Sequence, residues 1–153
     1  MSITFHAPGE PKGQPRPRAF ARRMGSKFVA RVFDCGTAEG WKSQIAVAAK
    51  PHAPDMPFGG PVMVSMRFCF ARPKSHYRTG KNAAILRDTA PDYHTSKPDA
   101  DNLAKAVLDC MTQLGAWWGD DQQVAQLNVE KWWASGHRLP GCYITVDAIR
   151  EVA

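Results

Sequence analysis

The sequence predicts an α+β fold, a small single domain in which a mixed β-sheet carries its two main helices on one face. Residues 62–70 alternate between apolar and other side chains, as a half-buried strand does. From Leu103 onward, apolar side chains recur at helical spacing up to residue 114. The expected elements follow in the order strand, strand, helix, strand, helix, strand, strand. A chain of 153 residues is expected to form one domain, spanning 1–153, with a proper core.

Local signals set the bounds of each element. Apolar side chains at every second position give the first strand, which Pro8 and Gly9 end. Prolines between the arginines of residues 11–18 exclude regular structure and favour a stiff, partly polyproline loop. Pro51 ends the first helix, and Gly115 ends the second. In chain order we expect a strand at 3–7, a basic loop at about 9–26, a strand at 27–33, a helix at 37–50, a Pro/Gly-rich connector at 51–60, a strand at 62–70, a basic loop at 73–98, a helix at 101–114, and strands at about 124–132 and 142–149.

Carboxylates gather around the second helix, although the net charge of the chain is +6. Asp99 and Asp101 stand two residues apart, so in extended chain their side chains point to the same side. Lys105 follows Asp101 one helical turn later, and a further acidic pair, Asp120 and Asp121, stands where the next strand begins. Mg²⁺ prefers oxygen ligands and is often held by one or two carboxylates, with substrate phosphate in other positions. These residues predict a metal-dependent phosphodiesterase that acts on nucleic acid.

The same residues have a simpler interpretation. An Asp before a helix often serves only as its N-cap. Asp101, Lys105 and Asp109 follow at i, i+4 and i+8, which is also the spacing of a solvated ladder of ion pairs. Two features favour a site: a cap needs one Asp, yet Asp99 is also present, and the later acidic pair can fold back toward the start of the helix.

Positive charge is concentrated in two segments of the chain. Residues 1–33 hold seven Lys and Arg against one acid, and residues 67–98 hold seven against two. Residues 99–153 hold four bases against eight acids. Basic loops that grip phosphates beside carboxylates that hold a metal would produce this separation. The expected DNA contacts are Lys12, Arg16, Arg18, Lys74, Arg78, Lys81, His94 and Lys97.

Other features of the composition are ordinary. No apolar run approaches the length of a membrane span, and the N-terminus lacks the apolar core of a signal peptide, so we expect no membrane partner and a cytoplasmic location. The four cysteines lack the paired spacing of a zinc site, and Cys69, Cys110 and Cys142 are expected to be reduced core residues.

The tryptophans at 117, 118, 132 and 133 are expected in the core or a dimer interface. For Glu130 and Lys131, an ion pair or a sheet edge is favoured over catalysis.

The acidic segment resembles the signature of the RusA-like Holliday junction resolvases. The resemblance depends mainly on residues 97–105, Lys-Pro-Asp-Ala-Asp-Asn-Leu-Ala-Lys, and on Asp-Asp-Gln-Gln-Val at 120–124. The opening loop at 9–18, Gly-Glu-Pro-Lys-Gly-Gln-Pro-Arg-Pro-Arg, is similar to that of the phage branch. Members of this family are small, dimeric, Mg²⁺-dependent endonucleases, often carried by bacteriophages and prophages.

The resemblance implies a role for each residue of the acidic motif. Asp99, Asp101 and one member of the later pair would be metal ligands, with Asp121 favoured over Asp120 by its order in the motif. Lys105 would be the accompanying catalytic lysine. The family further implies a RusA-like fold, Mg²⁺ with Mn²⁺ able to substitute, a homodimer, and paired symmetric nicks in four-way DNA junctions during recombination and repair. A phage-encoded protein would work in the cytoplasm of a bacterial host.

Two other functions fit parts of the sequence. A non-catalytic basic module that binds DNA junctions or replication forks would use its aspartates only as helix caps, and it predicts no Mg²⁺-dependent cleavage. A metal-dependent phosphohydrolase acting on nucleotides could use the same carboxylates. That function fits the charge distribution poorly, because a nucleotide needs only a compact pocket while the basic residues extend over two long segments.

Overall fold

The computed structural model describes the backbone of residues 1–14, 18–24, 27–33 and 39–151, and the side chains of 1–14 and 39–151. Its strands, α-helices and 3-10 turns follow in this order: β1 (Ser2–Pro8), β2 (Arg18–Met24), β3 (Lys27–Phe33), α1 (Glu39–Ala49), η1 (Lys50–His52), β4 (Val62–Phe70), η2 (Lys74–His76), η3 (Gly80–Asn82), α2 (Ala100–Leu114), η4 (Asp121–Gln123), β5 (Val124–Trp133) and β6 (Gly141–Ala148).

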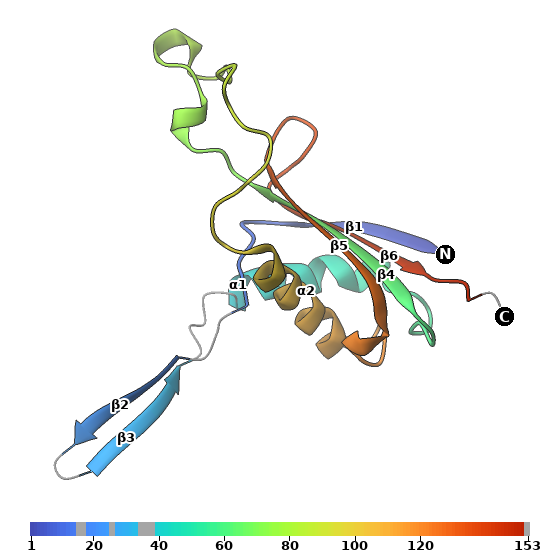
Figure 1. Ribbon diagram of the computed structural model, residues 1–153. Helices are drawn as coiled ribbons and strands as arrows, with labels where there is room; N and C mark the ends of the chain where they lie inside the picture. Colours follow the sequence, from blue (N-terminus) through green and yellow to red (C-terminus); the bar gives the residue numbers. More distant parts are fainter. Residues whose placement is uncertain (15–17, 25–26, 34–38, 152–153) are drawn as a thin grey trace.

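The main sheet is mixed, and both α-helices cover the same face of it (Figure 1). Its strand order is β1-β6-β4-β5, with β4 and β5 parallel and the other two pairs antiparallel. The α+β class and the mixed sheet expected from the sequence are confirmed. Strand β5 is the last in this order and therefore an edge strand, and its side away from β4 faces the segment that leads into α2.

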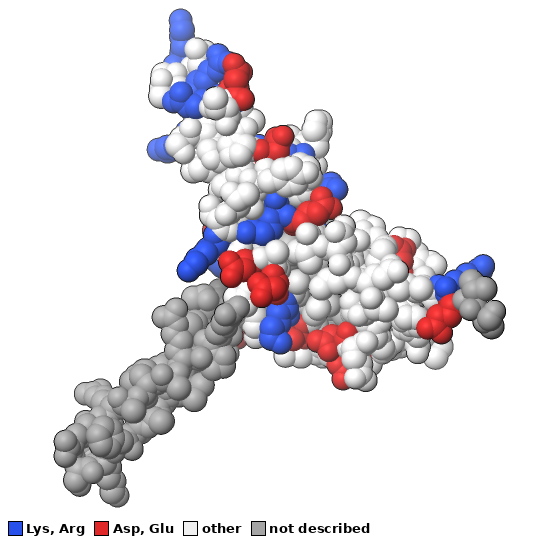
Figure 2. All heavy atoms as spheres, in the orientation of Figure 1, with Lys and Arg blue, Asp and Glu red and all other residues white. Residues whose placement is uncertain are grey.

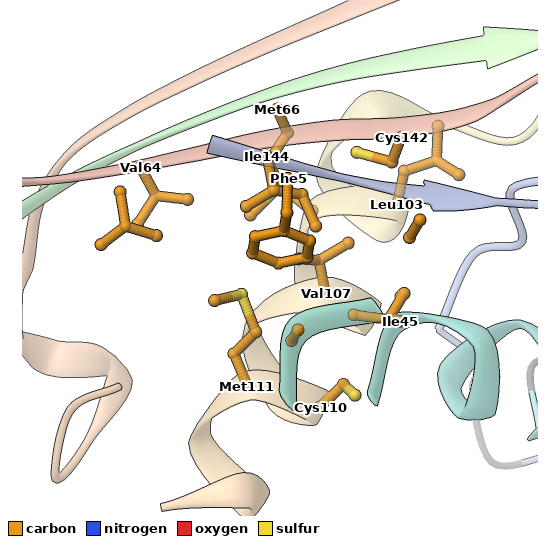
Figure 3. Close-up of a cluster of buried hydrophobic side chains, with 14 of the residues drawn as sticks. Phe5, Ile45, Val64, Met66, Leu103, Val107, Cys110, Met111, Cys142 and Ile144 are labelled. Carbon is orange, nitrogen blue, oxygen red and sulfur yellow. The ribbon is translucent and has the colours of Figure 1, made fainter. Parts of the chain in front are cut away.

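The core lies between the sheet and the two helices (Figure 3). The alternation of residues 62–70 places Val62, Val64, Met66 and Phe68 on this face, all at most 1% exposed. The helices contribute the apolar side chains that recur at helical spacing, including Ile45. The free cysteines at 69, 110 and 142 are buried as expected, and burial raises the pKa of each thiol, which keeps it in the unreactive protonated form.

Strands β2 and β3 form a separate antiparallel hairpin, in which Met24 pairs with Lys27 and Arg18 with Phe33. The hairpin extends away from the main sheet in Figure 1. The expectation of a loop over about 9–26 is therefore wrong for residues 18–24. Pairing with the strand at 27–33 supplies these residues with backbone hydrogen bonds.

Residues 71–98, which we call the arm, leave the sheet after β4 and return to it before α2 (Figure 1). The arm holds two short 3-10 turns and an antiparallel bridge between Tyr77 and Leu86, so its outer half is a small hairpin. At its base, Tyr93 forms an antiparallel bridge with Trp132 of β5. Among the helices that the structure describes, none combines the length and apolar character that crossing a membrane requires.

Candidate active site

The first turn of α2 presents two aspartates. Asp99 is the N-cap, with extended backbone angles of φ −71° and ψ 150°. Its carbonyl oxygen accepts the first helical hydrogen bond, from the amide of Leu103 at 3.0 Å, while its carboxylate makes no capping bond. Asp101 follows inside the first turn, and both side chains are exposed. Since the helix start does not use the carboxylate of Asp99, capping alone does not explain this residue.

Asp101, Lys105 and Asp121 line one cavity of about 460 Å³. Asp101 and Lys105 come from α2, one turn apart, whereas Asp121 comes from η4 and is separated from them by the rest of the helix. The remaining walls are side chains of α2 and β5, namely Ala100, Ala104, Leu108, Leu127 and Val129. Residues from two distant parts of the acidic motif therefore meet across a single cavity.

The side chain of Gln123, the last residue of η4, holds the turn that carries Asp121 in place. The side-chain oxygen of Gln123 accepts hydrogen bonds from the amides of Gly119 and Asp120, at 2.8 and 3.4 Å. Its side-chain nitrogen donates to the carbonyls of Phe58 and Gly60 in the connector after α1, at 2.8 and 3.0 Å. These bonds fix the chain around η4, and the side chain that reaches the cavity is Asp121, not Asp120.

Negative charge accumulates at Asp121. A side-chain hydrogen bond with Asp120 raises the pKa of Asp121 most, and partial burial and the charges of Asp120 and Asp109 raise it further. The charge of Lys105 opposes this shift. The ammonium of Lys105 lies 3.9 Å from the carboxylate of Asp109, and its charge also acts on Asp121. Neighbouring carboxylates disfavour each other's charged form, and a bound cation would oppose this effect.

The donor set suits a hard divalent cation held by one or two carboxylates. Asp101 and Asp121 are oxygen donors on one cavity, and the crowding of charge around Asp121 is what a bound cation would relieve. Within the part of the chain that the structure describes, no three His, Cys, Asp or Glu side chains form a metal site by themselves. Asp99 is not among the residues that line the cavity. Two carboxylates on one cavity fit an open site for a divalent cation, in which water and phosphate complete the coordination.

The loop after β1 packs on the start of α2. The amide of Gln14 donates a hydrogen bond to the carbonyl of Asn102 at 3.0 Å. A Cβ added at Gly13 would lie 3.3 Å from the Cβ of Asn102 and 3.5 Å from that of Pro98, so the close approach favours glycine here. The neighbouring Lys12 lies 3.7 Å from Glu10. The basic N-terminal loop thus begins beside the acidic motif, although the two are separated by 85 or more residues in the sequence.

The structure describes the side chains of some, but not all, of the residues expected to contact DNA. Lys74, Arg78 and Lys81 are exposed on the arm, and Lys97 is exposed at its end. Arg16 lies outside the described residues, and of Arg18 only the backbone, in β2, is described. Figure 2 shows Lys and Arg atoms at the far end of the arm and on both sides of a group of acidic atoms over the start of α2.

His94 requires a correction. Its side chain is 6% exposed and stacks on Phe70, with ring centroids 3.9 Å apart, while Trp133 lies 4.6 Å away. The ring is therefore part of the packing at the base of the arm, and it does not offer a surface to DNA. Basic and aromatic residues alternate along the arm, and this pattern alone does not distinguish a buried His94 from an exposed one.

Sequence reasoning missed two residues near the site. Arg72 has a side chain only 2% exposed and ties the base of the arm to the turn after β5. Lys131 lies on the edge strand β5, one of the two places expected for it, and its ammonium donates a 2.6 Å hydrogen bond to the carbonyl of Ser96, just before the acidic motif. One signal was available for Lys131: it interrupts a row of apolar side chains at every second position of β5, formed by Leu127, Val129 and Trp133.

Comparison with known proteins identifies the family of this chain. The model of the family described as "Endodeoxyribonuclease RusA" matches residues 8–147, which include both basic segments and the whole acidic motif. The chain is also similar to YqaN of Bacillus subtilis (strain 168), an uncharacterised protein, with 32% identity over 142 residues that cover 90% of this chain and 92% of that one. A match over nearly the full length shows that the chain belongs to the RusA family of endodeoxyribonucleases.

Proposed function

We propose that this protein resolves four-way DNA junctions by paired symmetric nicks in a Mg²⁺-dependent reaction, in recombination and repair. The observation that carries the proposal is the meeting of Asp101 and Asp121 across one cavity, with Lys105 beside them. In a chain of net charge +6, carboxylates around a cavity have a clear use if a cation lies between them and a phosphate.

Asp101 and Asp121 would hold the ion at the cavity, and Asp99, the N-cap of α2 two residues before Asp101, is the further ligand that the family resemblance implies, although it does not line the cavity. When bound, the ion supplies a water of lowered pKa and polarises the scissile phosphate. Mn²⁺, which also accepts oxygen ligands, would substitute for Mg²⁺. Asp120 lies outside the cavity lining, and its proposed part is to add negative charge beside Asp121.

Lys105 would place a compact positive charge beside the phosphate as negative charge develops during attack. Its ammonium lies 3.9 Å from the carboxylate of Asp109, and the Lys105 side chain is among those that line the cavity. The exposed bases of the arm and of the N-terminal loop would bind the DNA backbone on either side. Such contacts fix the register of the DNA and carry no sequence information directly.

Two chains are needed for this reaction. One chain has one cavity of this kind among its described residues, whereas resolution of a four-way junction takes two symmetric nicks. A homodimer with two-fold symmetry places two such sites on the two-fold symmetric junction. We further propose that the protein works in the cytoplasm, of a bacterial host if it is phage-encoded.

The proposal is tested by incubating the wild-type protein with a labelled four-way junction, and with linear duplex of the same sequence, in Mg²⁺ or in EDTA. We expect nicks at symmetric positions in opposite junction strands, only with Mg²⁺, and much slower cutting of the duplex. Mn²⁺ should restore cutting after EDTA treatment.

Two results would contradict the proposal in different ways. Tight junction binding without cleavage in either metal would favour the non-catalytic DNA-binding module, in which the aspartates act as caps. Equal cutting of junction and duplex would leave an endonuclease that does not select junctions.

A further inference from the structure

Lys131 lies on the face of the sheet that the helices cover. In the parallel ladder it pairs with Phe68, which is fully buried on that face. Val129 and Trp133, two residues before and after it on β5, also pack against the core. Side chains alternate between the two faces of a strand, so Lys131 projects to the same side as the apolar wall that Leu127 and Val129 give the cavity.

The Lys131 side chain is partly buried, and a hydrogen-bond partner stabilises its charged form where contact with water is reduced. Its partner is the carbonyl of Ser96, at 2.6 Å. The backbone around it is paired as well: the amide of His94 donates to the carbonyl of Lys131 at 3.0 Å, and the amide of Trp133 donates to the carbonyl of Asp92 at 2.8 Å. The last residues of the arm therefore lie along the free edge of β5, and the Lys131 side chain extends this attachment to Ser96.

The attachment ends three residues before Asp99. On its other side, Asp99 is fixed by the hydrogen bond from Leu103 to its carbonyl. Partial burial lowers the pKa of Lys131, and the charge of Asp99 opposes this shift, which places the two groups within electrostatic range of each other. The segment that carries Asp99 is thus held between the start of α2 and the ammonium of Lys131.

We propose that Lys131 is a positioning residue of the active site: by holding Ser96 on the edge of β5, it sets the place of the Asp99 carboxylate relative to the cavity lined by Asp101 and Asp121. The inference rests on the proposed function, and it assigns a role to a residue outside the acidic motif. Lys131 acts through Asp99, so its effect must depend on the presence of the Asp99 carboxylate.

The test is a double-mutant cycle on the binding of Mn²⁺ to the DNA-free protein, followed by the electron paramagnetic resonance signal of free Mn²⁺. Lys131→Met should raise the Kd for Mn²⁺ about tenfold, the range expected when the support of a metal ligand is removed. In an Asp99→Asn background the same substitution should change the Kd by less than about twofold, because the group that Lys131 positions is already lost.

Two further variants separate positioning from a general loss of charge or of folding. Lys50→Met removes one exposed lysine from η1, away from the site, and should leave the Kd unchanged. Lys131→Arg keeps a cation with N–H donors and should restore part of the affinity. If Lys131→Met fails to fold, Lys131→Ala, which likewise removes the side-chain N–H donor, takes its place in the cycle.

The inference is overturned if Lys131→Met binds Mn²⁺ as tightly as wild type, or if its effect is equally large in the Asp99→Asn background. Its failure is distinguishable from failure of the proposed function. If Asp101→Asn loses Mn²⁺ binding while Lys131→Met retains it, only the role of Lys131 is wrong. If wild-type protein neither binds Mn²⁺ nor cuts a junction, the proposed function falls and the inference falls with it.

Discussion

His94 occupies the point where the arm rejoins the sheet, between the rings of Phe70 and Trp133. Burial lowers the pKa of His94, and the nearby charge of Lys131 lowers it further. Its Nδ1 atom is buried without a hydrogen-bond partner among the described residues. A neutral ring suits this apolar setting, whereas a protonated ring would bring a second positive charge close to Lys131.

This setting predicts a specific dependence of stability on pH. The unfolded chain takes up a proton at His94 near the ordinary pKa of 6.5, while the native protein takes it up only at lower pH. The free energy of unfolding should therefore fall as the pH drops below about 6.5, with a slope of at most about 1.4 kcal/mol per pH unit from this residue. Urea unfolding between pH 7.5 and pH 5 measures it.

His94→Phe is the control variant, because it keeps an aromatic ring in the stack on Phe70 and removes the titratable imidazole. The stability of this variant should change less between pH 7.5 and pH 5 than that of the wild type. An identical loss of stability in both proteins would show that His94 is not responsible for the acid sensitivity.

At the scale of elements, the arm is attached to the sheet by Arg72 as well as by aromatic stacking. The Nε atom of Arg72 donates to the carbonyl of Ala134 at 2.8 Å, and Nη1 donates to the carbonyl of Pro91 at 2.7 Å. Asp92 adds a carboxylate at 3.9 Å. One nearly buried guanidinium thus connects the two ends of the arm, at residues 72 and 91–92, with the turn after β5.

Arg72→Met should loosen the base of the arm. It removes charge-assisted hydrogen bonds and leaves backbone carbonyls unpaired, at a cost of about 2–3 kcal/mol in the free energy of unfolding. Limited proteolysis should cut the arm of this variant faster than that of wild type, and junction binding should weaken because the basic side chains lose their fixed place.

Arg150→Met, which removes one exposed arginine near the C-terminus, is the control and should match wild type in both measurements. Wild-type rates of arm cleavage in Arg72→Met would mean that the aromatic contacts alone hold the arm.

At the scale of the whole molecule, regular patterns predicted most of the fold. Strand β4 matches the expected 62–70, and α2 differs by one residue from the expected 101–114, because period-two and helical spacing of apolar residues directly reflect which face is buried. Strand β2 was missed because its hydrogen bonds depend on a partner strand, a property that the composition of residues 18–24 alone does not contain.

The acidic motif was recognisable from spacing, but its geometry was not. The resemblance favoured Asp121 over Asp120, and Asp121 is the one that lines the cavity, but the spacing did not show that Gln123 holds this turn by donating to carbonyls more than 60 residues earlier in the chain. The position of Lys131 likewise depends on Ser96, 35 residues away, through a backbone carbonyl that every residue type possesses. Contacts of this kind have no sequence signature, so only the folded chain reveals them.

The central claim is that the acids around α2 hold a cation against the DNA backbone. The most direct measurement is the single-turnover rate of junction cleavage, with the junction Kd, for Asp101→Asn and for the control Asp55→Asn, which changes an exposed acid of the connector after α1. Asp101→Asn should cut at least about 100-fold more slowly and still bind the junction, while the control should match wild type. If Asp101→Asn cuts the junction at the wild-type rate in Mg²⁺, the metal site proposed for this protein is wrong.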